Sequence, residues 1–144
     1  LIFRSSKLFS VILETHSGKE LRKLFDTRVT EYWQKHYLFG RKSSVSTKKM
    51  GEKSIDILLI NTVIPFLFAW GKKKNDQHRM EEAIRLLEEI KPENNAIIHR
   101  WKERGVTCQS AFDSQALLQL KKNYCEEKKC LQCRIGHKVL TINK

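Results

Sequence analysis

Three of the four cysteines in this 144-residue chain lie within nine residues of one another. Cys125, Cys130 and Cys133 have the spacing C-x4-C-x2-C, and a two-residue gap lets two thiolates face one ion. Thiolates are soft ligands, so zinc or an iron–sulfur cluster would suit them better than magnesium. His137 would complete a site of three cysteines and one histidine, and Cys108 is the other candidate for the fourth ligand.

The cysteine spacing has three interpretations. A closed metal site needs four ligands, and only three cysteines are close in sequence, so ordinary thiols without a cofactor are the favoured interpretation. A metal site is the second interpretation, and redox or disulfide chemistry is the third. The irregular spacing is not that of a small secreted scaffold stapled by disulfides, which indicates a cytoplasmic compartment.

A second group of residues mixes aromatic and basic side chains between Tyr32 and Lys42. Aromatic rings stack on unpaired bases, and basic side chains contact phosphates. The candidate nucleic-acid residues are Trp33, Lys35, His36, Tyr37, Arg41 and Lys42. A well-solvated basic surface is the competing interpretation, because lysine outnumbers arginine 19 to 9 and the recognition of phosphates and bases relies on the arginine fork.

The formal net charge of the chain is +12 at pH 7, from 28 basic and 16 acidic residues. The excess lies toward the ends of the chain: residues 1–48 hold ten bases and four acids, and residues 106–144 hold seven and three. A surface with this charge attracts nucleic acid, anionic lipid or an acidic protein.

The sequence contains none of the common catalytic motifs, such as a Walker A loop, G-x-G-x-x-G, H-E-x-x-H or G-x-S-x-G. An enzyme would require the polar residues Asn61, Asn94 and Asp113 to converge in one pocket. Helix capping is the favoured explanation for Asn94 and Asp113, and a hydrogen bond to a neighbouring backbone group is the favoured one for Asn61. The sequence therefore favours a non-catalytic module over an enzyme.

Helices must position these groups, because apolar residues recur with a period near 3.6 and period-2 alternation is scarce. The clearest amphipathic helix covers residues 76–90. Thr30 is expected to cap a short helix that Gly40 ends, and Asn94 or Asn95 a helix that ends before Gly105. Ser110 and Asp113 have capping-box spacing. Residues 41–53 are expected to form a loop, and residues 139–142 a short strand or extended segment.

The longest apolar stretch, Ile55 to Trp70, is predicted to be a buried core helix that breaks or kinks at Pro65. Its sixteen residues fall short of the roughly 20 needed to cross a bilayer, so no membrane is expected as a partner. The predicted fold is all-α: one domain over residues 1–144, a compact multi-helix bundle around the apolar helix, with a short irregular cysteine-containing C-terminal segment.

Several strings in the chain resemble the C-terminal portion of an uncharacterised bacterial family of unknown function, found in Bacteroidetes-type genomes. They are Tyr32-Trp33-x-x-His36-Tyr37-x-Phe39-Gly40, Ile60-Asn61-Thr62-Val63-Ile64-Pro65-Phe66, Glu93-Asn94-Asn95, Asp113-Ser114-Gln115-Ala116-Leu117 and Asn123-Tyr124-Cys125-x4-Cys130-Leu131-x-Cys133-Arg134-Ile135-Gly136. The resemblance implies that the chain, which begins at Leu1 rather than Met, is the C-terminal part of a longer protein. It implies no activity.

Three functional hypotheses follow. The first is a non-catalytic basic helical module that contacts nucleic acid. The second is a structural or interaction module that docks onto its own N-terminal region, with an exposed apolar patch as its signature. The third is part of an enzyme in which the three polar helix-end residues line a site.

Overall fold

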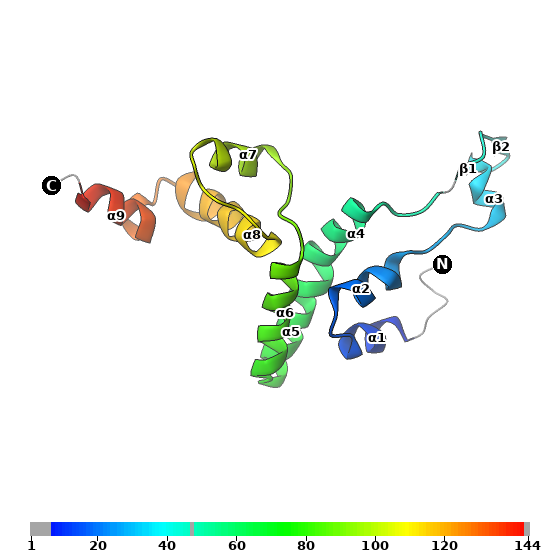
Figure 1. The fold of residues 1–144 in the computed structure, drawn as a ribbon, viewed down its shortest axis with the longest axis horizontal. Coiled ribbons are helices and arrows are strands. Elements are labelled where there is room, and N and C mark those ends of the chain that lie inside the picture. The colour runs from blue at the N-terminus through cyan, green and yellow to red at the C-terminus, as the bar shows by residue number, and fades with distance from the viewer. Residues whose placement is uncertain (1–6, 47, 143–144) are drawn as a thin grey trace. The chain divides into compact units, whose positions relative to one another are not determined.

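The computed structural model describes residues 7–46 and 48–142 of the chain, which are mostly helical with one two-stranded hairpin (Figure 1). This confirms the all-α class. The described residues divide into two compact units, the first ending at Leu87 and the second beginning at Glu88. The single domain expected from the length of the chain stays a prediction, since two compact units can belong to one domain.

The first unit holds most of the buried apolar side chains. Its elements are α1 (Leu8–Glu14), α2 (Gly18–Phe25), α3 (Glu31–Gln34), β1 (His36–Leu38), β2 (Arg41–Lys42), α4 (Glu52–Leu58), the π-helical turn η2 (Leu59–Val63), α5 (Ile64–Lys74) and α6 (Gln77–Glu89), whose last residues belong to the second unit. The core of this unit consists of Leu21, Ile55, Leu59, Ile60, Val63, Ile64, Leu67, Ala83 and Leu86.

The apolar helix predicted for Ile55 to Trp70 continues past Pro65 without a break. Proline lacks an N–H, and its ring crowds the carbonyl oxygen four residues earlier in an α-helix. The π turn η2 directly precedes this site, and Ile64 donates its N–H to the carbonyl oxygen of Leu59, five residues back. The wider turn makes room for the proline ring, so the chain accommodates Pro65 inside a continuous helix.

That continuous helix, Glu52–Lys74, has 23 residues and is long and apolar enough to cross a membrane, judged by length and composition alone. The sequence-based expectation that the segment is too short was wrong, because the helix includes polar residues at both ends of the apolar stretch. Core helices of soluble proteins meet the same criterion. One face of this helix is buried among its neighbours, and Arg22 Nε on α2 donates to Asp56 Oδ1 at 2.8 Å. About 39% of the apolar span is buried, so the helix has one buried face and one exposed face.

The helix predicted between Thr30 and Gly40 is only one turn long. It stops at Gln34, and the chain then forms the antiparallel pair of β1 and β2. Gly40 lies between these strands with φ of +72°, a conformation that glycine adopts readily, so it forms the hairpin turn rather than a helix end. Aromatic residues such as Tyr37 and Phe39 also favour extended backbone over helix. Arg41 and Lys42, expected in a loop, form the second strand.

The second unit contains two helices joined by a loop, followed by the cysteine-containing segment. Its elements after α6 are α7 (Ala96–Glu103), α8 (Ala111–Leu120), the π-helical turn η3 (Lys121–Cys125), the 3-10 turn η4 (Cys130–Gln132) and α9 (Arg134–Ile142). The strand or extended segment expected at residues 139–142 was wrong, because α9 extends over them. Thr141 Oγ1 donates to the His137 carbonyl oxygen one turn back in that helix.

The caps predicted for α7 and α8 are confirmed. Asn95 Oδ1 accepts from the N–H groups of Ile97 and Ile98, so Asn95 rather than Asn94 caps α7. Gly105 follows the helix with φ of +79°. The Gly105 N–H donates to the Lys102 carbonyl oxygen, and the Val106 N–H donates to the Trp101 carbonyl oxygen. This pair of hydrogen bonds is that of a Schellman motif. Ser110 and Asp113 form a reciprocal capping box at the start of α8.

Replacing Asp113 by asparagine is expected to destabilise the chain by about 1 kcal/mol near pH 7, the usual size of a cap contribution. The N–H groups of Gln109 and Ser110 donate to this carboxylate and lower the pKa of Asp113 below its ordinary value of 3.8. Because the folded state binds the proton less readily than the unfolded state, the stabilisation is complete above the ordinary pKa. It is lost as the pH falls below that value through the lowered one.

Urea unfolding of Asp113→Asn and of the unaltered chain, followed by circular dichroism at pH 7 and pH 3, measures this effect. The difference in unfolding free energy should shrink at the lower pH. Glu103→Gln, which removes an exposed carboxylate from the last turn of α7, provides the charge control and should change little at either pH. A difference of the same size at both values would show that the carboxylate charge does not carry the cap.

Candidate functional site

The segment from residue 28 to residue 49 leaves and returns to the same place, because its two ends pair with each other. We call it the basic–aromatic hairpin. An antiparallel bridge between Arg28 and Lys49 joins its two ends. Within it, β1 pairs with β2, and the Ser43 N–H donates to the Lys35 carbonyl oxygen at 2.7 Å. α3 and the two short strands therefore hold their side chains in a fixed local arrangement.

Four aromatic side chains of the basic–aromatic hairpin form one connected cluster. The Tyr32 ring stacks on the His36 ring, with centroids 4.1 Å apart and planes 6° apart. Trp33 meets Tyr32 edge-on at 5.1 Å and Phe39 edge-on at 4.9 Å. Gly40 donates its N–H to Tyr32 Oη, which ties the turn to the cluster. Phe39 is nonetheless 82% exposed, so the cluster supports a ring that faces solvent.

A second exposed ring carries a cation. Tyr37 is 69% exposed, and Lys48 Nζ lies 3.4 Å from the centroid of its ring. The same ammonium donates to the His36 carbonyl oxygen at 2.8 Å, so it is held in place. Residues 32–51 contain five lysines and arginines and no aspartate or glutamate. The aromatic faces of the hairpin thus lie in a segment of purely positive charge.

The structure brings together all six residues predicted to contact nucleic acid. Trp33 and His36 are half-buried within the hairpin, and the remaining four are exposed: Lys35, Tyr37, Arg41 and Lys42. The prediction did not select Phe39 or Lys48 as site residues. The turn formed by Gly40 exposes Phe39. If residues 30–40 formed the predicted helix, the aromatic and basic side chains would instead be distributed around the helix axis. The sequence signal for the turn is Gly40 alone, because glycine adopts positive φ readily both in turns and at helix ends.

The three clustered cysteines lie together in the second unit. Cys125, Cys130 and Cys133 line one small apolar pocket, whose other lining residues are Trp101, Leu120, Tyr124, Ile135 and Gly136. Cys125 and Cys130 are exposed, and Cys133 is buried.

The other two residues weighed as metal ligands do not line this pocket. His137 is exposed on α9, and Cys108 is buried before α8 with its Sγ 4.0 Å from the Ser110 carbonyl oxygen. Across residues 7–46 and 48–142, no group of three or more histidine, cysteine, aspartate or glutamate side chains is arranged to hold a metal ion. The site for zinc or an iron–sulfur cluster therefore stays a prediction without support from the geometry.

Two of the three residues named for an enzyme site bond to their own helices. Asn61 Nδ2 donates to the Ile57 carbonyl oxygen at 3.0 Å, as expected for a polar residue in an apolar helix. Asp113 caps α8, and Asn94 is exposed just before the residue that caps α7. Capping and local hydrogen bonding account for Asn61 and Asp113.

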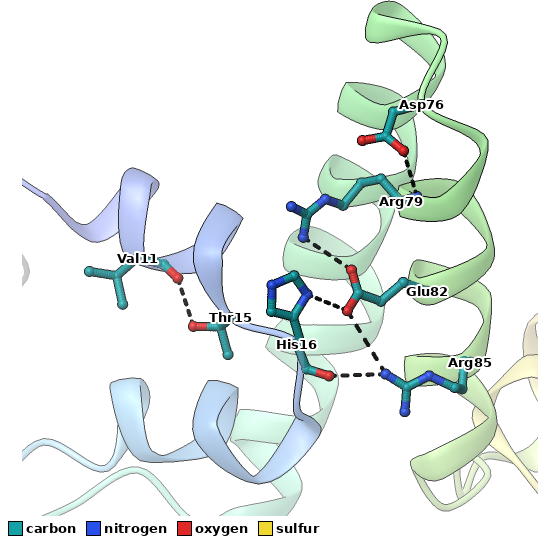
Figure 2. Close-up of polar contacts among 7 residues, drawn as sticks. All are labelled: Val11, Thr15, His16, Asp76, Arg79, Glu82 and Arg85. Carbon is teal, nitrogen blue, oxygen red and sulfur yellow. Dashed lines mark hydrogen bonds and ion pairs between the residues drawn. The ribbon is translucent and has the colours of Figure 1, made fainter.

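A buried carboxylate, not recognised in the sequence, joins the α1–α2 connection to α6 (Figure 2). Glu82 has a side chain only 7% exposed, and its Oε1 lies 2.5 Å from His16 Nδ1. Arg79 Nη1 donates to Glu82 Oε2 at 3.0 Å, and Arg85 Nη2 donates to the His16 carbonyl oxygen at 3.0 Å. In Figure 2 the imidazole and both guanidinium groups face this one carboxylate.

The Glu82 cluster has the chemistry of a structural anchor. Its carboxylate is flanked by two arginines of its own helix, Arg79 and Arg85. The helical pattern places Glu82 between Arg79 and Arg85 on α6, but nothing in the sequence relates it to His16, 66 residues earlier.

The 3-10 turn η4 and the last helix, α9, expose apolar side chains. Leu131, Ile135, Val139 and Leu140 are all more than half exposed. The interaction hypothesis requires an exposed apolar face of this kind, and docking through it stays a prediction.

Comparison with known proteins identifies the family to which the chain belongs. A search of curated proteins and a search of solved structures found no match. A family model described as "Protein of unknown function (DUF2851)" matches residues 1–96, which include the basic–aromatic hairpin and the long apolar helix. The string at residues 113–117 and the cysteine string lie beyond the matched residues. The chain belongs to this family of proteins of unknown function, DUF2851.

Proposed function

We propose that the chain is a non-catalytic module that binds single-stranded nucleic acid through the basic–aromatic hairpin. The observation that carries the proposal is the exposure of Phe39 and Tyr37 in a segment that has five basic residues and no acidic one. Exposed apolar groups that lie together on a surface often mark an interaction site. Stacking on bases uses the rings, and the basic side chains neutralise phosphates.

The proposal specifies single strands rather than a duplex. A ring stacks on a base only when that base is unpaired, and two short strands with Phe39 next to their turn offer open ring faces instead of a recognition helix. Lysine supplies most of the charge of the hairpin, which suits contacts to phosphates without sequence readout. We therefore expect binding that tolerates different base sequences.

The binding experiment uses the full chain and fluorescently labelled oligothymidylate and oligouridylate of about 12 nucleotides, within the range of sites known for single-strand modules. Anisotropy at several salt concentrations gives the affinity and its salt dependence. Phe39→Ala should weaken binding about 5- to 150-fold, the range for loss of one stacked base, with little change in the salt slope. Because Phe39 is mostly exposed, this variant should fold normally.

The charge arm of the experiment replaces Arg41 and Lys42 by glutamine. If both contact phosphates, the slope of log affinity against log salt should decrease in magnitude by about 1.4, since each contact to a single strand contributes about 0.7. Lys72→Gln/Lys73→Gln removes the same charge from the exposed end of α5 and is the matched control. An equal loss of affinity in that control, or undiminished binding by Phe39→Ala, would contradict the proposed surface. Equal binding to a duplex would exclude the stacking mechanism.

A further inference from the structure

The three clustered cysteines differ in a way that the nucleic-acid proposal does not use. Cys130 is exposed and Cys133 is 8% exposed, although both line the same pocket. Their backbones are joined by the 3-10 turn η4, in which the Cys133 N–H donates to the Cys130 carbonyl oxygen at 3.2 Å. Residues paired across such a turn have Cα atoms closer than about 7 Å, which overlaps the range that a disulfide bridges.

The backbone around this turn is held from both sides. The Lys129 N–H donates to the Tyr124 carbonyl oxygen at 2.8 Å, and the His137 N–H donates to that of Cys133 at 2.8 Å. Gly136, in the first turn of α9, lies so close to Cys130 that an added Cβ would come within 2.5 Å of the Cys130 carbonyl oxygen. The absence of a side chain at Gly136 therefore lets the backbone of Cys130 pack against the first turn of α9.

From this arrangement we infer that Cys130 and Cys133 form a reversible dithiol–disulfide pair, with Cys130 as the thiol that reacts first and a peroxide as the oxidant. An accessible thiol beside a resolving cysteine is the arrangement of redox-sensitive sites. The free thiols are the reduced state of this pair. The inference is independent of the nucleic-acid surface, which lies in the first unit.

The chemistry balances with one peroxide per pair. The Cys130 thiolate attacks one peroxide oxygen, so that an S–O bond forms and the O–O bond breaks, which leaves a sulfenic acid and releases water after protonation. Cys133 then attacks the Cys130 sulfur, so that the S–S bond forms, the S–O bond breaks and a second water leaves. The two thiols lose two electrons and the peroxide gains them. A small dithiol reductant reverses the step by thiol–disulfide exchange.

Trypsin separates the competing products cleanly. Cleavage after Lys129 and Arg134 places Cys130 and Cys133 in one peptide, residues 130–134, whereas Cys125 falls in a different peptide, residues 123–128. The reduced full chain is treated with one equivalent of hydrogen peroxide, and its remaining thiols are alkylated. The protein is then digested with trypsin, and the peptide masses are measured by mass spectrometry. We expect most of the peptide 130–134 to lose two hydrogens and to regain them with dithiothreitol.

Single substitutions test the order of events. Cys133→Ser should stop disulfide formation and leave a sulfenic acid on Cys130 that dimedone traps, whereas Cys125→Ser should leave the disulfide yield unchanged. Cys108 should be the slowest thiol to be alkylated, because burial raises its pKa above the ordinary value. Disulfide-linked peptides that join Cys125 to Cys130, or dimedone on Cys133 and not on Cys130, would overturn the assignment.

The role of Gly136 gives a test that leaves both sulfurs in place. Gly136→Ala must displace the Cys130 turn from α9 and should lower the disulfide yield several-fold, provided that circular dichroism shows the helices to be retained. Gly51→Ala is the matched control, because nothing lies within 4 Å of its added Cβ. An unchanged yield in a folded Gly136→Ala variant would show that the pairing does not depend on this packing. If the unaltered chain does not form the disulfide between Cys130 and Cys133, the inference is wrong.

Discussion

Replacing Ile55 by alanine is expected to lower the free energy of unfolding by about 3 kcal/mol. Ile55 lies on α4 with only 4% of its surface exposed, where that helix packs on α2. The substitution removes three carbon atoms from the core and leaves a cavity that the surrounding helices fill only in part. Urea unfolding followed by circular dichroism measures the loss as a lower midpoint at an unchanged slope.

Ile57 provides a control of the same residue type on the same helix. Its side chain is 56% exposed, so Ile57→Ala should change the unfolding free energy by no more than about 0.5 kcal/mol. The pair of variants separates the buried face of α4 from its exposed face without altering charge. Similar losses at the two positions would contradict the assignment of this long apolar helix as a core helix with one buried face.

The second large effect concerns the buried carboxylate of α6. Glu82→Gln should destabilise the chain by about 2 kcal/mol, because hydrogen bonds to a charged group contribute about 1.5–3 kcal/mol, while the partners His16 and Arg85 are themselves more than half exposed. Arg79 loses a charged acceptor at 3.0 Å, and His16 faces an uncharged amide in place of the carboxylate at 2.5 Å. The connection between α1 and α2 would then be held less firmly on α6, and amide hydrogen exchange in α1 should accelerate.

Glu81 is the matched control for this substitution. It precedes Glu82 on the same helix but is exposed, and it accepts a hydrogen bond only from Gln77, one turn earlier, among the contacts described. Glu81→Gln removes the same charge and should cost less than about 0.5 kcal/mol. If the two variants unfold at the same denaturant concentration, the Glu82 cluster is not the anchor that its geometry indicates.

Neither the buried face of α4 nor the Glu82 cluster involves the exposed rings of the basic–aromatic hairpin. Phe39 and Tyr37 project from a segment closed on itself by the bridge between Arg28 and Lys49. Substitutions at these rings should therefore leave the unfolding transition nearly unchanged while altering binding. Unfolding and binding measurements on the same variants thus distinguish a functional surface from a part of the core.

The features that the sequence predicted correctly depend on neighbours within one turn of a helix. The amphipathic pattern of residues 76–90 gives α6, Ser110 and Asp113 cap α8, and Gly105 ends α7. Each follows from hydrogen bonds or side-chain spacing over three or four residues, which are the same in any helical fold. For the same reason Asn61 bonds to its own helix, as the sequence indicated.

The predictions that were wrong concern segments whose conformation depends on competing local structures or on partners distant in the sequence. Residues 36–42 have a spacing compatible with helix, but cross-strand pairing and the turn at Gly40 favour a hairpin. The sequence predicted a break or a kink at Pro65; the helix does not break there, because a π turn accommodates the proline and the apolar face on both sides of it is buried.

The composition, the helical periodicity and the caps alone determined that this protein is a basic, all-α chain with its aromatic residues near lysines and arginines. Only the tertiary structure decided that Phe39 and Tyr37 are exposed, that Glu82 meets His16, and that Cys125, Cys130 and Cys133 share a pocket without forming a metal cluster among the described residues. The physical reason is that burial and contact depend on which surfaces meet after folding. Sequence spacing sets the face of a helix but not the neighbour that covers it.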